Sequence, residues 1–259
     1  MKVNVHNSLG VAVNLAYQRF AAEGLQNFAS ANGSIDPSRV TNTGHSNAYG
    51  AGVRVGWLGE LNRSISVGAT FQSRTYTSKF DRYRGVFAEQ GGFDAPANVA
   101  GGAAVKVHPK VTALFDVERI FYGQVKSIAN SDSNQALLGS NNGPGFGWHD
   151  ITAIKTGLAY SVTPAFTLRG GYNYSGLPFD RNQTFFNLLA PAVVQHHLHL
   201  GATWTRPSGK EVTLAYVHAF ENTVHGVNSI PPSAGGGNAN LHMYQNSIVL
   251  GFGWDRNKK

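Results

Sequence analysis

The most constraining feature of this sequence is an alternation of bulky apolar and smaller residues that recurs along the chain. In SIVLGFGW, residues 247–254, large apolar side chains occupy every second position and end on Trp254. Successive side chains of a strand point to opposite faces of a sheet, so this pattern predicts a strand with one bulky apolar face. About ten such segments occur, beginning near residues 9, 49, 65, 99, 111, 154, 166, 198, 212 and 247.

The connections between these segments alternate in length. The long ones span residues 21–46, 78–96, 123–149, 176–194 and 222–241, and the short ones span 58–64, 108–110, 161–165 and 206–210. A transmembrane barrel has short turns at one end and long loops at the other, and its tilted strands need about 9 to 11 residues to cross the bilayer. The sequence therefore predicts an all-β, transmembrane antiparallel β-barrel that forms a single domain over residues 1–259.

Aromatic residues fall near the ends of the predicted strands. One set precedes the short turns or the end of the chain: Trp57, Tyr160, Trp204 and Trp254. A second set precedes the long loops: Phe20, Tyr76, Phe121, Tyr174 and Phe220. Aromatic girdles at both membrane interfaces are typical of such barrels. A soluble β-sandwich is the alternative, and it would bury Val53, Phe71 and Leu168 between two packed sheets.

The composition argues against several classes of function and of binding site. The net charge of +7 comes from scattered basic residues, without the clusters that favour nucleic-acid binding. With no cysteine, the chain has neither disulfides nor a cysteine-based metal site. No apolar run approaches the roughly 18 residues of a membrane helix. The start, MKVNVHNSLG, lacks the apolar run of a signal peptide, so we expect either that the chain is not exported or that its true N-terminus lies upstream.

Several stretches resemble a known family of outer-membrane transporters. GFGWHDITAIKTGLAYSVTPAFTLRGGYNYSGLPF (145–179), FNLLAPAVVQHHLHLGATW (186–204) and LAYVHAFENTV (214–224) are similar to the C-terminal half of the FadL/TodX family, and LGVAVNLAYQRFAAEGLQNFA (9–29) resembles its strand leading into a long loop. The resemblance implies a fourteen-stranded barrel of which about ten strands are present here, with the N-terminal hatch missing. SIVLGFGW resembles the closing strand that the barrel assembly machinery reads.

The same resemblance implies what the protein does and where. We expect transport of long-chain fatty acids or other hydrophobic molecules across the bacterial outer membrane, by loop capture and passage through a barrel. It implies contact with outer-membrane lipid and lipopolysaccharide, a monomer, and neither cofactor nor catalysis. A truncated, transport-incompetent barrel fragment is one alternative. An outer-membrane enzyme is another, although the paired acidic residues and Asp/His pair of ten-stranded barrel proteases are not apparent.

Two sets of candidate ligand-binding residues follow. The first two long loops offer apolar side chains that, by resemblance, would shape a capture groove: Leu25, Phe28, Phe80, Val86, Phe87 and Phe93. The alternative is that these side chains only pack their loops together.

A carboxylate inside the barrel would favour a cation, and the candidates on or near the small-residue face are Arg19, Arg54, Arg74, Lys106, Lys155 and Arg169. Ordinary hydrated lumen residues would also explain these cations.

Three other pairs of polar residues give weaker evidence for a functional site. His197 and His199 share a strand face, but no carboxylate or cysteine lies beside them, so no metal site is predicted. The pairs Asp116 with Glu118 and His218 with Glu221 are expected to be hydrated barrel groups, and no catalytic residue is assigned.

Overall fold

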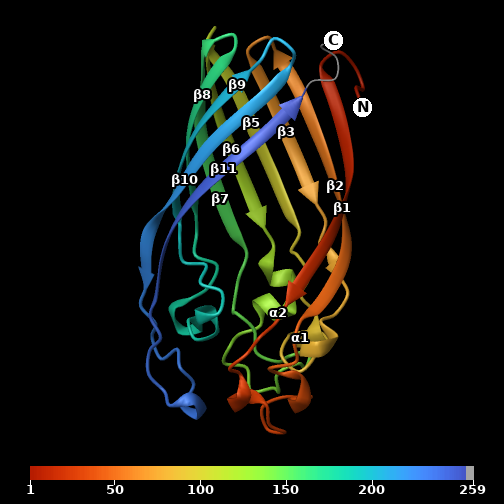
Figure 1. Ribbon diagram of the computed structural model, residues 1–259, viewed down its shortest axis with the longest axis vertical. Helices are drawn as coiled ribbons and strands as arrows, with labels where there is room; N and C mark the ends of the chain where they lie inside the picture. The colour runs from red at the N-terminus through yellow and green to blue at the C-terminus, as the bar shows by residue number, and fades with distance from the viewer. Residues whose placement is uncertain (255–259) are drawn as a thin grey trace.

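The computed structural model describes residues 1–254, and its framework is one antiparallel sheet (Figure 1). Its eleven strands are β1 (Asn7–Phe20), β2 (Ser46–Asn62), β3 (Ile65–Gln72), β4 (Tyr76–Thr77), β5 (Asn98–His108), β6 (Val111–Ile120), β7 (Ile151–Thr163), β8 (Phe166–Ser175), β9 (His196–Thr205), β10 (Lys210–Val224) and β11 (Leu241–Trp254). The all-β prediction is confirmed. The strand beyond the expected ten is β4, which has two residues and pairs with β2.

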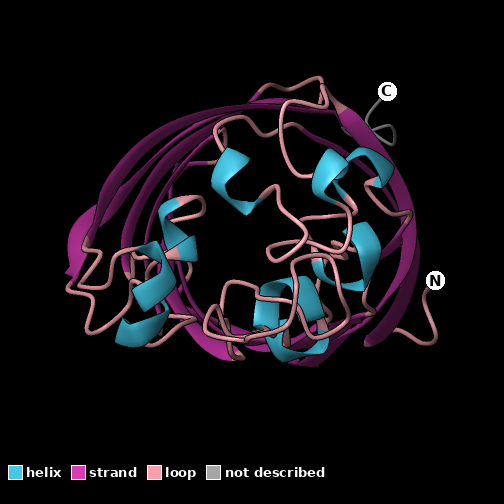
Figure 2. Cartoon of the chain, turned by 90° about the horizontal axis from the view of Figure 1, so that it is seen from below, coloured by secondary structure: helices cyan, strands magenta, loops and turns pink. Residues whose placement is uncertain are grey.

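Neighbouring strands in the sheet are neighbours in sequence. The order is β1-β2-β3-β5-β6-β7-β8-β9-β10-β11, and all ladders are antiparallel. The sheet curls into the wall of a barrel (Figure 2). Within residues 1–254, β1 forms a ladder only with β2, and β11 only with β10. β1 and β11 therefore do not pair with each other, and the barrel formed by residues 1–254 is open.

The bulky face of the sheet points outward. Val53, Phe71 and Leu168 are 44%, 46% and 43% exposed, so they are not buried between two sheets and the sandwich alternative is wrong. Leu15 is 85% exposed and Ile248 is 78% exposed. Such large exposed apolar side chains on successive strands are those that a bilayer would cover.

Short and long connections lie at opposite ends of the barrel (Figure 1). The short turns cover residues 63–64, 109–110, 164–165 and 206–209, at the same end as the N-terminus and the last residue of β11. Trp57, Trp204 and Trp254, at this end, are exposed as expected for a girdle. At the other end Tyr76, Tyr174 and Phe220 are exposed.

The girdle assignment of Phe20 is wrong, because this side chain packs inside the barrel. Tyr17 points outward, and Phe20, three residues later on the same strand, has the opposite parity. Phe121, after the end of β6, is half-buried.

The long loops carry short helical turns, and many of them lie within the ring of strands when the barrel is viewed along its axis (Figure 2). The four-residue segments are α1 (Ala88–Gly91) and α2 (Lys126–Ala129). The 3-10 turns are η1 (Gln26–Phe28), η2 (Pro37–Arg39), η3 (Asp81–Tyr83), η4 (Tyr122–Gln124), η5 (Arg181–Gln183), η6 (Phe186–Leu188) and η7 (Pro232–Ala234). None of the helices within residues 1–254 has the length and apolar character to cross a membrane.

Candidate functional site

The loop end of the barrel contains a cluster of buried apolar residues, three of them aromatic, which we call the first cluster: Ala48, Phe80, Tyr83 and Phe87. Phe20 of β1 packs edge-on against Tyr83 and Phe87, with ring centroids 4.8 and 4.9 Å apart. The Tyr83 hydroxyl donates to the Gly44 carbonyl at 2.7 Å and accepts from the Ala22 amide at 2.9 Å. The cluster therefore joins β1, β2 and the first two long loops into one packed unit.

The structure divides the predicted groove residues between two places. Phe80 and Phe87 are buried in the first cluster, and Val86 and Phe93 pack against it while remaining partly exposed. Phe28 instead meets Phe186 of a later loop, with ring centroids 6.2 Å apart. Leu25 and Phe28 are half-buried; Phe28 ends the 3-10 turn η1, and Leu25 directly precedes it. Burial of Phe80 and Phe87 matches the alternative in which these two side chains pack their loops.

Sequence reasoning missed a second buried cluster, formed by Phe179, Val193, Val224 and Leu241. Trp148 packs against this second cluster and donates from its indole N–H to Asn187 Oδ1 at 2.6 Å. The many apolar residues in the long loops could have predicted this cluster, because a fully solvated loop would contain few of them.

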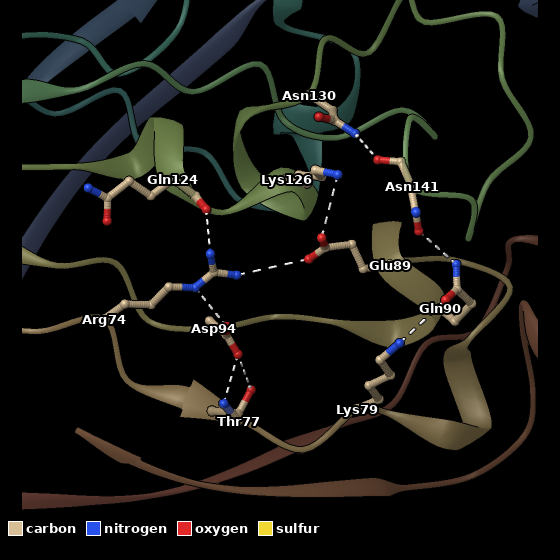
Figure 3. Close-up of polar contacts among 10 residues, drawn as sticks. All are labelled: Arg74, Thr77, Lys79, Glu89, Gln90, Asp94, Gln124, Lys126, Asn130 and Asn141. Atoms are coloured by element: carbon tan, nitrogen blue, oxygen red, sulfur yellow. Dashed lines mark hydrogen bonds and ion pairs between the residues drawn. The ribbon is translucent and has the colours of Figure 1, made fainter.

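A polar network crosses the loop end beside the first cluster (Figure 3). Arg74 donates to Asp94 Oδ2 at 2.7 Å and to the Gln124 carbonyl at 2.6 Å, and its Nη2 lies 3.9 Å from Glu89 Oε2. Lys126 Nζ lies 3.6 Å from the other oxygen of Glu89. The network ties the end of the β3–β4 connection and the 78–97 loop to the 121–150 loop.

The backbone at the centre of this network is strained. Glu89 and Gln90 both have φ of 59°, and Gly91 has φ of 98°, so α1 is a left-handed turn rather than a regular helix. Left-handed non-glycine residues cost about 1 to 3 kcal/mol each and persist only where their surroundings hold them. Gln90 donates from its backbone to the Gly139 carbonyl at 2.9 Å and from its side chain to Asn141 at 3.0 Å. The 121–150 loop therefore holds this turn in place.

Four of the predicted lumen cations have different environments. Arg54 binds the Gln72 amide oxygen across the β2–β3 ladder, and Arg169 binds the Thr203 hydroxyl across β8–β9. Lys155 forms an ion pair with Glu118, with Nζ and Oε2 2.7 Å apart. Arg19 follows Tyr17 by two residues on β1 and therefore lies on the same outward face. It does not point into the lumen with the other cations.

A groove of about 550 Å³ lies on the inner wall towards the short-turn end. Its floor is formed by small residues of β1, β2, β3 and β5, among them Gly10, Gly56, Gly68 and Gly102. Leu58, Leu114 and Asp116 also line it. Because small side chains leave the wall thin at this place, the lumen can accept an apolar molecule against the strands.

Asp132 is a buried acid in the loops. Burial raises the pKa of the Asp132 carboxyl to about 6, while backbone N–H groups of Phe186 and Phe185 partly oppose this rise. Its Oδ2 has no hydrogen-bond partner among residues 1–254. The Asp132 backbone N–H donates to Gln183 Oε1 at 2.8 Å, so the acid lies where the 121–150 loop meets the 176–195 loop.

His197 and His199 lie on the inner face of β9, with ring centroids 6.3 Å apart. Throughout residues 1–254, no three His, Asp or Glu side chains gather closely enough to hold a metal ion.

A curved antiparallel wall with an apolar outer face, short turns at one end and long packed loops at the other defines an outer-membrane β-barrel. Residues 1–256 match the sequence profile of a family described as outer membrane protein transport protein (OMPP1/FadL/TodX), and the chain belongs to this family. Members of this family are outer-membrane transport proteins rather than enzymes.

Solved structures share the fold. The toluene transporter TodX of P. putida is 17% identical with a TM-score of 0.61, and the match covers 96% of this chain and 66% of TodX. A FadL homologue from Pseudomonas aeruginosa is 14% identical with a TM-score of 0.59, covering 97% of this chain and 64% of that one. The CymD monoaromatic hydrocarbon channel is 14% identical with a TM-score of 0.54, covering 100% and 72%. No curated protein sequence matches the chain. The chain thus spans about two thirds of the length of TodX and of the FadL homologue.

Proposed function

We propose that this protein transports hydrophobic small molecules, a class that includes long-chain fatty acids and aromatic hydrocarbons, across the bacterial outer membrane. The observation that carries the proposal is the presence of two separate apolar surfaces inside the barrel. Partly exposed aromatic side chains lie at the loop end, and the 550 Å³ groove lies farther along the inner wall. Hydrophobic compounds gain roughly 25 cal/mol per Å² of apolar area removed from water, so both surfaces favour such cargo.

Within this proposal the apolar loop residues have different roles. Leu25, Phe28, Val86 and Phe93 keep part of their surface exposed and are proposed to contact cargo during capture. Phe80 and Phe87 are buried and are proposed to act indirectly, by holding the loops in the arrangement that presents those surfaces.

We also propose the surroundings in which this happens. The exposed apolar outer face suits outer-membrane lipid, and the loop end suits contact with lipopolysaccharide. The last strand, β11, ends on Trp254, an exposed aromatic that is proposed to engage the barrel assembly machinery. The working unit is proposed to be a monomer.

Uptake of labelled toluene by cells that carry the full chain in their outer membrane tests the proposal. Replacing Phe28 and Phe186 together by Ala removes the aromatic pair between two loops, and we expect uptake to fall about 3- to 10-fold. Tyr49→Ala, on the outward face of β2, is the control and should leave uptake unchanged. Heat-modifiable gel mobility confirms that each variant is folded.

Unchanged uptake in the folded double variant would show that this pair does not capture cargo. A folded wild-type protein that takes up no hydrophobic probe would instead support the transport-incompetent barrel.

A further inference from the structure

The inner wall of the barrel is balanced in charge. In the regular ladders of the described strands, and leaving histidines aside, the inward positions include four basic and four acidic residues: Arg54, Lys106, Lys155 and Arg169, and Glu60, Asp116, Glu118 and Glu211. A wall of this kind has no general excess of positive charge that would attract a carboxylate.

The cation across the ladder from Asp116 is already neutralised, and neither Arg54 nor Lys106 lines the groove. Lys155 lies directly across the β6–β7 ladder from Asp116, yet its ammonium group pairs with Glu118, one position along on the same face, at 2.7 Å. Glu118 is the more buried partner, with 22% of its side chain exposed. An incoming carboxylate would therefore have to displace Glu118 before it could bind Lys155.

Asp116 is consequently left facing the groove. Its carboxylate lies over Gly102 of β5, so closely that a Cβ added to Gly102 would collide with Asp116 Oδ1. Asp116 is among the residues that line the groove, and the structure gives its carboxylate no ion-pair partner within residues 1–254. The apolar floor of Gly68, Gly102 and Leu114 thus has one negative charge at its edge.

We infer that the groove selects uncharged apolar cargo and disfavours anions such as fatty-acid carboxylates, with Asp116 as the residue that determines this selectivity. The inference rests on the proposed transport function and narrows its substrate class. The groove floor binds the apolar part of any cargo, so discrimination arises at the polar end of the molecule. A hydroxyl group can donate a hydrogen bond to Asp116, whereas a carboxylate at the same place is repelled.

Two probes that differ only in this polar end test the inference: decanol and decanoate, supplied at pH 8 to cells that carry the full chain. Wild-type protein should take up decanol in preference to decanoate. Asp116→Asn removes the negative charge with little change of shape and should raise decanoate uptake about 3- to 10-fold, the effect expected of one charge a few ångströms from the cargo head group. Decanol uptake should stay within about twofold.

Matched variants separate charge from packing. Glu118→Gln frees the Lys155 ammonium and should also raise decanoate uptake, whereas Asp116→Glu keeps the charge and should preserve discrimination. Heat-modifiable mobility reports folding, and Glu118→Gln decides the question if Asp116→Asn does not fold.

The outcomes separate the two proposals. Equal uptake of both probes by wild-type protein, or an unchanged ratio in folded Asp116→Asn and Glu118→Gln, overturns the selectivity while the transport function stands. Uptake of neither probe by folded wild-type protein overturns the transport function and the selectivity together.

Discussion

The strand wall and the loop end of this barrel are built by different physical rules. In the wall, each strand pairs with the next one in sequence, and the large apolar side chains point out of the protein. At the loop end, segments about fifty residues apart are joined, as where Ser34 binds the Gly85 carbonyl, and the aromatic side chains are buried. The wall therefore depends on its solvent, the bilayer, whereas the loops depend on a core like that of a small soluble protein.

Tyr83→Ala should strongly destabilise the loops without unfolding the strand wall. Tyr83 is fully buried in the first cluster, and its hydroxyl bonds to both Gly44 and Ala22. Removal of a buried aromatic ring costs about 3 to 5 kcal/mol, and here that cost falls on the loops. Proteolysis of loops at the surface of intact cells should increase sharply, while heat-modifiable mobility of the barrel stays normal. Simultaneous loss of the folded barrel band would show that wall and loops are not separable.

Leu214→Arg and Ala215→Arg, adjacent positions of β10, test the wall itself. Leu214 points outward and pairs with Leu250, whereas Ala215 is on the inner face beside Gly201. An arginine on the lipid face costs about 2 to 4 kcal/mol near the bilayer midplane, and one in the lumen costs far less. Unfolding in urea from lipid vesicles should show the larger loss for Leu214→Arg. Equal losses would argue against a bilayer on that face.

Arg74→Met addresses the polar network between the loops. Asp94 is 8% exposed, and the substitution leaves its Oδ2 without its cationic partner, although Thr77 still donates to Oδ1. We expect the opening of the 78–97 and 121–150 loops to become easier by about 2 to 3 kcal/mol, measured by amide hydrogen exchange at residues 88–91 and 126–129.

Arg119→Met is the control for this change. Arg119 lies 3.7 Å from Asp150 in a half-exposed pair, and its loss should cost less than about 1 kcal/mol. Similar exchange rates in both variants would mean that the Arg74 network does not hold the loops.

A pH-dependent effect on loop stability is expected at Asp132. Its carboxyl has a pKa of about 6 in the folded loops against an ordinary 3.8, so the folded state favours the neutral acid. The contribution of Asp132 to loop stability should be most favourable below about pH 4, decline as the pH rises towards 6, and be least favourable above that. Asp132→Asn should remove this dependence and stabilise the loops by about 1 to 2 kcal/mol at pH 7.

The difference between wild type and Asp132→Asn in thermal unfolding of the loops, followed from pH 4 to pH 8, measures this effect. A difference that does not change with pH would contradict the assigned titration.

The same contrast explains how much the sequence could predict. The wall was predictable because parity is a local property: once Tyr17 is known to point outward, the orientation of every residue back to Leu9 follows. The loop end was not, because the contact of Phe28 with Phe186 depends on how loops far apart in sequence fold over the lumen. Sequence likewise identified Lys155 and Arg169 as inward cations, but their partners Glu118 and Thr203 depend on ladder register and side-chain rotamer.

Substitution of Gly102 during evolution would change which cargo the groove accepts. Any side chain at this position would collide with the Asp116 carboxylate and with the Phe115 carbonyl, so the carboxylate would leave its place beside the groove and the β5–β6 backbone would shift. A single codon change to alanine or serine could therefore relocate a charge in the passage without altering the charged residue itself. The selectivity of such a lumen can change through substitution of its glycines, although a glycine has no functional group that contacts cargo.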